Sequence, residues 1–207
     1  MITQKIDFES CLRACDRWNK MPKNDPNIYT TVEKTYAGFV AEEVIHKMMP
    51  NLVPSTGSDV YHYDFLFGTL KIEVKNKCGK ELPKPDFDGS VPTYWVPRCD
   101  IFLHTRMCSQ ERWHVFPRGF TVEDKIAKED FKKIAETFME KYTTLFLCGT
   151  IRNEKFWKVK KLEERGTELN GHGQKAIMDT WNVKYWQCTP PQKLLKVYEE
   201  RYETTIR

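Results

Sequence analysis

The chain contains 207 residues, of which 40% are apolar and 30% are charged. This length and apolar content are enough to bury the core of one compact domain. The net charge of +4 permits a polyanionic partner without requiring one. No apolar run reaches the roughly 18 residues of a membrane span, and the N-terminal segment lacks the apolar centre of a signal peptide. We therefore expect a cytoplasmic protein with no membrane partner.

Seven cysteines are dispersed along the chain without a Cys-x-x-Cys pair. A zinc site needs closely spaced Cys and His ligands, and a disulfide framework usually has an even number of cysteines. The sequence therefore predicts neither. Aromatic residues make up 13% of the chain, which argues against a disordered protein.

Two helices are predicted near the N-terminus. Apolar residues recur at helical spacing over residues 7–19, behind a cap at Asp7. A longer helix is expected over 31–49, where Thr30 and Glu33 have the spacing of a capping box and Pro50 ends the run.

A β-hairpin is predicted next, because the pattern over residues 60–77 alternates and Gly68-Thr69 supplies a turn. The proline-rich stretch 79–97 is expected to be a surface loop. Strand character returns over 98–107, and residues 112–117 are a candidate hairpin partner for that strand.

The C-terminal half alternates helices and strands. A helix is expected over 128–142, a strand over 144–150 and a helix over 153–164. An alternating strand over 181–188 and a closing helix over 192–202 follow. The predicted fold class is α/β, with a central mixed sheet of about five strands flanked by helices. We expect one domain over 1–207, with a core over about 31–150 and accessory elements over about 151–207.

The residues best suited to catalysis lie in the predicted hairpin. Glu73 and Lys75 share one face of a strand because side chains alternate, and the turn at Gly68 folds Asp64 back beside them. Two carboxylates can hold a hard divalent cation such as Mg²⁺ or Mn²⁺. A neighbouring lysine can orient or deprotonate a water molecule, or stabilise negative charge that develops during phosphodiester hydrolysis.

These residues resemble the PD-(D/E)xK nuclease superfamily, which has the restriction-endonuclease-like fold. Residues 73–75 match the E-x-K element, Asp64 matches the lone acidic element, and residues 38–45 resemble the first helix of that superfamily. The matching region covers about residues 31–107. The resemblance implies an αβββαβ core, divalent-metal binding and cleavage of nucleic acids. It also implies catalytic roles for Asp64, Glu73 and Lys75, and a metal site of Glu42, Asp64 and Glu73.

The C-terminal region resembles accessory structure of phage or large-virus members of the superfamily. This resemblance implies that the strand near residues 145–150 pairs with the later tryptophan-rich strand.

Several alternatives remain open at this stage. Tyr63 stands where the superfamily motif has proline, and Asp59 competes with Asp64 for the acidic role. Glu43 competes with Glu42, which we favour for its offset from Gly38.

We expect most of the histidines to be structural residues. His46, one turn after Glu42, is a candidate metal ligand or else a surface residue. The remaining histidines considered, His62, His104 and His114, have no partner at a diagnostic spacing and are expected to be structural.

Basic residues gather around the candidate site. We expect Lys71, Lys77 and Arg98 to contact nucleic-acid phosphates, with Lys80 and Lys84 nearby. Tyr94 and Trp95 are candidates for stacking on bases. An ordinary solvated loop would have the same composition.

The sequence therefore predicts a Mg²⁺- or Mn²⁺-dependent nuclease that acts on DNA rather than RNA. One alternative is a nucleic-acid-binding module without catalytic activity, and another is an RNA endonuclease that uses His46. A homodimer is plausible, because two copies are the simplest way to cut both strands of a duplex.

Overall fold

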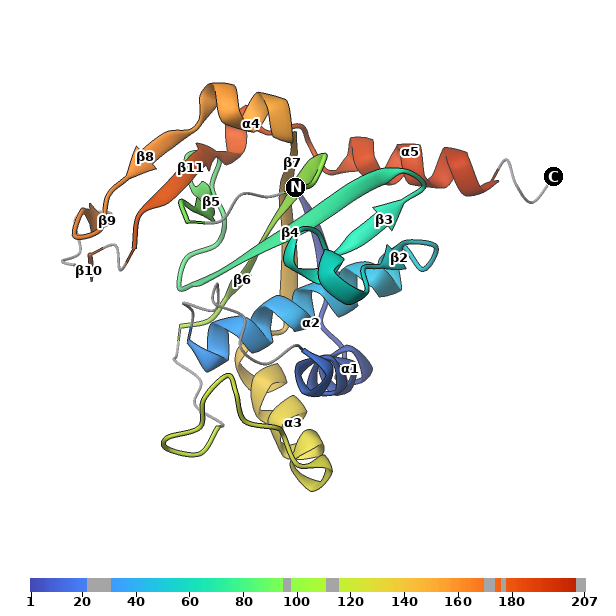
Figure 1. Ribbon diagram of the computed structural model, residues 1–207, viewed down its shortest axis with the longest axis vertical. Coiled ribbons are helices and arrows are strands. Elements are labelled where there is room, and N and C mark those ends of the chain that lie inside the picture. The colour runs from blue at the N-terminus through green and yellow to red at the C-terminus, as the bar shows by residue number, and fades with distance from the viewer. Residues whose placement is uncertain (22–30, 95–97, 111–115, 170–173, 176–177, 204–207) are drawn as a thin grey trace.

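A six-stranded mixed sheet forms the centre of the molecule, and helices flank it (Figure 1). The computed structural model describes residues 1–21, 31–94, 98–110, 116–169, 174–175 and 178–203. The α helices are α1 (Phe8–Lys20), α2 (Val32–Met48), α3 (Phe131–Lys141), α4 (Asn153–Val159) and α5 (Gln192–Glu203). The strands are β1 (Ile2–Lys5), β2 (Val53–Pro54), β3 (Phe65–Phe67), β4 (Leu70–Gly79), β5 (Asp88–Pro92), β6 (Ile101–Cys108), β7 (Thr144–Arg152), β8 (Lys161–Glu163), β9 (Glu168–Leu169), β10 (Gln174–Lys175) and β11 (Thr180–Lys184).

The central sheet has the order β1-β7-β6-β4-β3-β2. Strands β4 and β6 are parallel, and the other neighbouring pairs are antiparallel. The predicted α/β class with a mixed sheet is therefore confirmed, although the sheet has six strands instead of about five. The sheet includes the edge strands β1 and β2, which are too short to show a clear alternating pattern, and it lacks the strand predicted over 181–188, which belongs to a smaller sheet.

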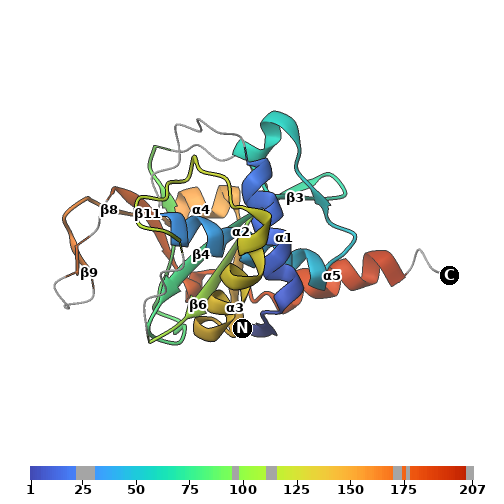
Figure 2. The ribbon, with the colours of Figure 1, turned by 90° about the horizontal axis from the view of Figure 1, so that it is seen from below.

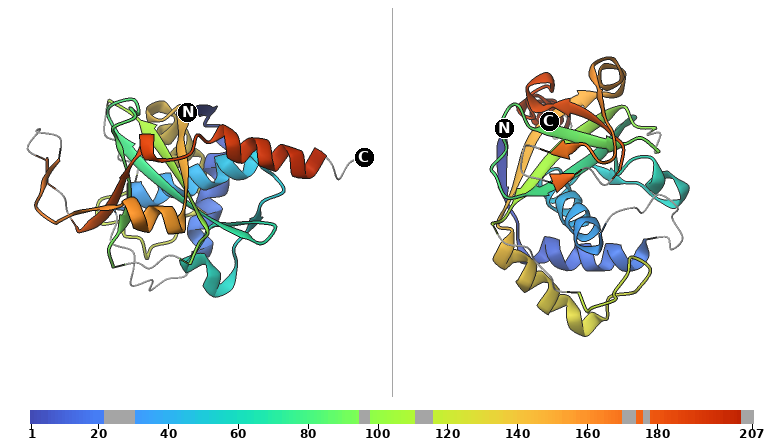
Figure 3. Two further views of the ribbon diagram at one scale, coloured as in Figure 1. Left: turned by 90° about the horizontal axis from the view of Figure 1, so that it is seen from above. Right: turned by 90° about the vertical axis from the view of Figure 1, so that its left-hand side faces the viewer.

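Helix α2 lies between α1 and the central sheet (Figure 3). Helix α1 begins at the predicted cap, where the Ser10 amide donates to the Asp7 carboxylate at 3.1 Å. Helix α2 is capped by Thr31, whose hydroxyl accepts from the Lys34 amide at 3.4 Å. The predicted cap, Thr30, lies outside the described residues. Because α2 is covered on opposite sides, even Glu42 and Glu43 are buried in it.

The predicted hairpin is confirmed and positions the candidate site. Strands β3 and β4 pair antiparallel around Gly68, which adopts a φ of +62°, a conformation that favours glycine. The first strand is shorter than predicted, because residues 57–61 form a 3-10 helix. Along β4, Ile72 and Val74 enter the core beneath α1 and α2, which directs Glu73 and Lys75 to the other face.

A smaller sheet of order β5-β11-β8 packs with α4 over a second apolar cluster (Figure 1). This cluster consists of Tyr63, Val91, Cys99, Phe102, Ile151, Phe156 and Val183. Three predictions fail here. The stretch 79–97 is not a continuous loop, because it contains β5; the helix predicted over 153–164 ends at Val159; and β11 pairs with β5 and β8, not with β7. Residues 185–187 form a 3-10 helix after β11.

The remaining predicted elements are found close to their expected bounds. Helix α3 and strand β7 match residues 128–142 and 144–150, and β6 matches 98–107. The closing helix α5 packs Tyr198 against Phe67, with ring centroids 5.7 Å apart. Most of the strand predicted over 112–117 lies outside the described residues. Within the described ranges, no helix is both long and apolar enough to cross a bilayer.

We predict that glycine-to-alanine substitutions at two positions change the stability in opposite directions. A Cβ atom at Gly89 would lie 2.4–2.6 Å from ring atoms of the fully buried His104, so Gly89→Ala should lower the free energy of unfolding by about 1–3 kcal/mol. A Cβ atom at the helical Gly38 meets no atom within 4 Å, so Gly38→Ala should raise it by about 1 kcal/mol. Urea unfolding measures both, and a neutral Gly89→Ala would contradict the packing between the two sheets.

Candidate active site

Asp64 is held beside β4 by hydrogen bonds to two backbone groups of that strand. Its amide donates to the Ile72 carbonyl at 2.9 Å, and its Oδ2 accepts from the Val74 amide at 2.7 Å. The carboxylate therefore extends the pairing of the hairpin just before β3 begins. Its side chain is only 13% exposed, so the hairpin fixes a charged group in a nearly dry position.

Glu73 and Lys75 form an ion pair on the same strand. Lys75 Nζ donates to Glu73 Oε1 at 2.5 Å, and the Glu73 side chain is only 9% exposed. A charged hydrogen bond of this kind is strong in a dry environment. The pair thus fixes the lysine next to a carboxylate, as the alternation along the strand predicted.

Helices α1 and α2 bring two acidic and two basic side chains to the Asp64 side of the hairpin. Arg17 of α1 contacts Glu42 Oε2, and its guanidinium also lies 3.8 Å from Asp64 Oδ1 and 3.7 Å from Glu43 Oε1. Arg13, one turn earlier, donates from Nε to Glu43 Oε2 at 2.9 Å. Arg17 therefore connects both helices to the hairpin.

Burial shifts the titration of the acidic residues. It raises the pKa of Glu42 well above the ordinary value; Arg17 opposes this shift, and Asp64 and Glu73 add to it. Burial, together with repulsion from Asp64, raises the pKa of Glu73 to about 7 despite Lys75. Burial also raises the pKa of Asp64, against the effect of Arg17. The carboxylates therefore hold protons more strongly than exposed ones do.

Burial has the opposite effect on the basic residues, but their acidic neighbours outweigh it. Burial lowers the pKa of Lys75, but Glu73 and Asp64 outweigh that effect and leave the pKa above its ordinary value. Similarly, the carboxylates around Arg17 outweigh its burial and raise its pKa. Both side chains are therefore held in the charged form at neutral pH.

The donor set suits a hard divalent cation, because Glu42, Asp64 and Glu73 offer only carboxylate oxygens. Glu42 Oε2 is also buried without a regular hydrogen-bond partner among the described residues, although it contacts Arg17. Within the described ranges, however, no three acidic, histidine or cysteine side chains converge closely enough to hold an ion as they stand. The chemistry of the cluster fits a metal, and its side chains would have to close around one.

The residues predicted to contact nucleic acid differ in accessibility. Arg98 is exposed, and Lys71 lies with its ammonium 5.2 Å from the centre of the Tyr63 ring. Asp100 joins their two segments, because its Oδ2 accepts from the Lys71 amide at 2.8 Å. Lys77 is partly buried, and burial lowers its pKa although Asp88 and Glu163 oppose the shift. Lys71 is partly buried as well, so Arg98 is the most accessible of the three side chains.

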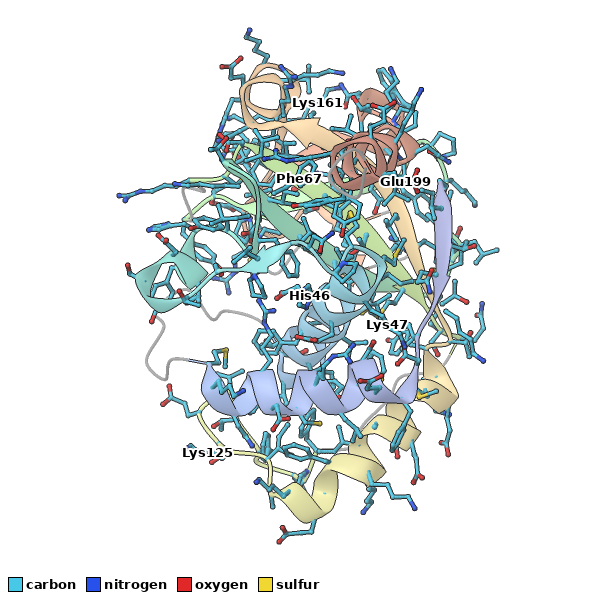
Figure 4. The ribbon with its side chains drawn as sticks, turned by 90° about the vertical axis from the view of Figure 1, so that its right-hand side faces the viewer. His46, Lys47, Phe67, Lys125, Lys161 and Glu199 are labelled. Carbon is cyan, nitrogen blue, oxygen red and sulfur yellow. The ribbon has the colours of Figure 1, made fainter. Side chains whose placement is uncertain are left out.

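The competing candidates have other contacts. Asp59 is exposed in the 3-10 helix and accepts a hydrogen bond from the Tyr63 hydroxyl at 2.7 Å. His46 lies on α2 beside the hairpin (Figure 4), where its ring stacks on Phe65 with centroids 5.8 Å apart. Glu43 binds Arg13, which leaves Glu42 in closer contact with Arg17.

The other histidines differ in what the structure shows of them. His104 is fully buried in β6, and burial, with Lys77 and Lys75, lowers its pKa to about 3. Neither of its ring nitrogens has a hydrogen-bond partner in the described part of the chain. His62 Nδ1 is likewise buried without such a partner. His114 lies outside the described residues.

Arg13 and Arg17 belong to no sequence motif that predicted their place in the cluster. Their i,i+4 spacing places them on one face of α1, at the border of the apolar stripe of Cys11, Ala14, Cys15 and Trp18. That position could have indicated a buried ion pair, because arginines at such a border can reach into a neighbouring interface. Which acidic residues they would meet depended on the packing of α1 against α2.

We predict a specific pH dependence for the metal-free protein. The pKa of Glu73 is about 7, against an ordinary value of 4.5, so the folded state binds this proton more readily than the unfolded chain. The resulting stabilisation is present below pH 4.5 and is lost as the pH rises towards 7. Over this range, the free energy of unfolding in urea and a chelator should fall less steeply for Glu73→Gln than for the wild type. Equal slopes would contradict the assignment.

Comparison with known proteins gives no match to a family, a curated protein or a solved structure. The residues of this chain and their geometry are therefore the basis for a function. The two central observations are the hairpin that joins Asp64 to the Glu73–Lys75 pair and the arginine that joins the hairpin to Glu42.

Proposed function

We propose that this protein is a divalent-metal-dependent nuclease that hydrolyses phosphodiester bonds, with DNA as the favoured substrate. The observation that carries the proposal is the position of Asp64, Glu73 and Lys75 on one hairpin, in electrostatic contact with the buried Glu42 of α2. This residue set also underlies the resemblance to the PD-(D/E)xK superfamily.

The acidic residues share one part in the proposed chemistry, which is to bind the metal ion. Glu42, Asp64 and Glu73 would hold the cation, which when bound neutralises charge on the phosphoryl oxygens and lowers the pKa of water. Mg²⁺ and Mn²⁺ both suit carboxylate ligands. The backbone hydrogen bond from Val74 keeps one oxygen of Asp64 turned towards β4, which limits the directions in which its other oxygen can bind.

Lys75 acts as a cation in this proposal. Because Glu73 and Asp64 raise its pKa against the effect of burial, the ammonium is charged at neutral pH and cannot take a proton from water. It can stabilise negative charge that develops on the phosphoryl group and donate a hydrogen bond to the attacking water. Of the roles predicted from the sequence, we therefore favour charge stabilisation.

Arg98 and Lys71 would guide the nucleic acid to this end of the hairpin. The Asp100 amide donates to the Lys71 carbonyl at 2.8 Å, so the segment that carries Arg98 lies beside the start of β4. Lys71 precedes Glu73 by two residues on the same strand face. Phosphates bound at these cations would be close to the acidic cluster, and a homodimer would present two such clusters to the two strands of a duplex.

A second candidate function is a nucleic-acid-binding module without catalytic activity. The observation that favours it is Arg17, which neutralises part of the acidic cluster in the absence of any metal. In that case the ion pairs would serve only to join α1, α2 and the hairpin. Binding of Mn²⁺ by calorimetry separates the two candidates, because the binding module predicts no heat of binding.

We predict that Glu73→Ala and Lys75→Ala each reduce metal-dependent cleavage by roughly a thousandfold, the scale for losing a group that stabilises transition-state charge. Supercoiled plasmid, linear duplex, single-stranded DNA and RNA with Mn²⁺ form the substrate panel. Lys158→Ala, on the exposed side of α4, is the matched control and should cut as the wild type does. Retained cutting by folded Glu73→Ala protein would reject the assignment, and cutting of RNA alone would reject DNA as the substrate.

We predict that Arg98→Ala and Lys71→Ala each lower the salt dependence of DNA binding by about one unit in the slope of log K against log salt. The control is Lys132→Ala on α3, whose side chain is 76% exposed on a helix that packs mainly against α1. Fluorescence anisotropy at several salt concentrations measures the slopes. An unchanged slope for both Arg98→Ala and Lys71→Ala would place the DNA elsewhere.

A further inference from the structure

We infer that Arg17 occupies the place between Glu42 and Asp64 that a divalent cation takes, and that the cation binds as the guanidinium moves to Glu43. This inference rests on the proposed function and adds a means of controlling metal binding at the same site. It also gives separate roles to the adjacent residues Glu42 and Glu43: the first binds the metal, and the second receives the displaced arginine.

The geometry supports direct competition. The Nη2 atom of Arg17 contacts Glu42 Oε2 and lies 3.8 Å from Asp64 Oδ1, so one nitrogen is close to oxygens of two proposed ligands. Mg²⁺ binds its ligand oxygens at about 2.1 Å, which would bring these two oxygens close together around the ion. A guanidinium nitrogen and a metal ion cannot both fit there.

Electrostatics exclude a shared position as well. The side chains of Arg17, Glu42 and Asp64 are 23%, 10% and 13% exposed, so water screens charges in this region weakly. A divalent cation beside a guanidinium would therefore repel it strongly. In the metal-free state the same low exposure favours the arginine, because it compensates carboxylates that would otherwise be buried without a counterion.

Glu43 provides a nearby place for the displaced group. Its Oε1 already lies 3.7 Å from Arg17 Nη1, while its Oε2 accepts a hydrogen bond from Arg13. The guanidinium carbon of Arg17 also lies 5.7 Å and 5.9 Å from the ring centres of Phe39 and Phe65. These rings can remain in contact with the cation during a small side-chain rotation, so the movement requires no change in the backbone.

The test measures Mn²⁺ affinity by calorimetry for the wild type, Arg17→Gln, Glu43→Gln and the double variant. Arg17→Gln should bind roughly tenfold more tightly, the gain when a binding arrangement present in about a tenth of the molecules becomes the dominant one. Glu43→Gln should bind more weakly than the wild type, because Arg17 loses its second acceptor. In the Arg17→Gln background, Glu43→Gln should have a much smaller effect.

Two controls test whether a change in net charge or a failure to fold accounts for the result. Lys47→Gln removes one positive charge from the same helix pair, where Lys47 Nζ lies 3.3 Å from Asp7 Oδ2, and should leave the affinity within twofold of the wild type, as expected for a partly exposed and screened charge. The double variant removes one charge of each sign, so it provides a charge-balanced protein if Arg17→Gln alone does not fold. It should also bind Mn²⁺ more tightly than the wild type.

The outcomes separate this inference from the proposed function. Equal or weaker Mn²⁺ binding by folded Arg17→Gln and by the double variant, with clear binding by the wild type, overturns the displacement and leaves the metal site intact. No binding by any of the proteins overturns both. In the wild type, the Arg17 Nε–H nuclear magnetic resonance signal should shift on addition of Mg²⁺, and an unchanged signal at saturating metal overturns the displacement independently of the variants.

Discussion

Several acidic side chains are buried between α1, α2 and the β3–β4 hairpin, and this arrangement constrains the rest of the structure. A buried carboxylate without a counterion is costly, so Glu42, Glu43 and Asp64 require the cation that Arg17 supplies. That cation comes from α1, which covers α2 on the side opposite the sheet and also buries the apolar stripe of Cys11, Ala14, Cys15 and Trp18. Figure 2 shows the two helices and α3 on one side of the central sheet.

The same arrangement determines what the cluster can bind. Helix α2 is buried on opposite sides, so its acidic residues cannot turn towards water without leaving the core. The hairpin supplies Asp64 through backbone hydrogen bonds and Glu73 through strand alternation, and neither depends on a mobile loop. Carboxylates fixed in this way can bind protons or an arginine, and the metal ion of the proposed function would compete for the same oxygens. Control of a nuclease by its own arginine would follow directly from that competition.

Local sequence patterns predicted the part of the fold that carries the site. The cap at Asp7, the turn at Gly68 and the alternation of Glu73 with Lys75 are short-range features, and each is found in the structure. The smaller sheet was harder to predict, because β5 pairs with β11 about ninety residues later and is only five residues long. Its flanking prolines suit an edge strand as well as a loop, so the local pattern could not distinguish them.

The candidate site was predictable to the same extent. Asp64, Glu73 and Lys75 share one hairpin, so spacing alone brought them together. Arg17 lies 47 residues before Asp64 in the sequence and meets it only through the packing of α1 on α2. The choice between Glu42 and Glu43 also depended on that packing, since both are buried and differ mainly in which arginine they contact more closely.

The most direct test of this account is a crystal structure of the protein with Mn²⁺, in which anomalous scattering locates the ion. The account predicts one ion bound by Glu42, Asp64 and Glu73, with the Arg17 guanidinium moved onto Glu43. An ion elsewhere, or a cluster in which Arg17 still contacts Glu42 at saturating Mn²⁺, would contradict it.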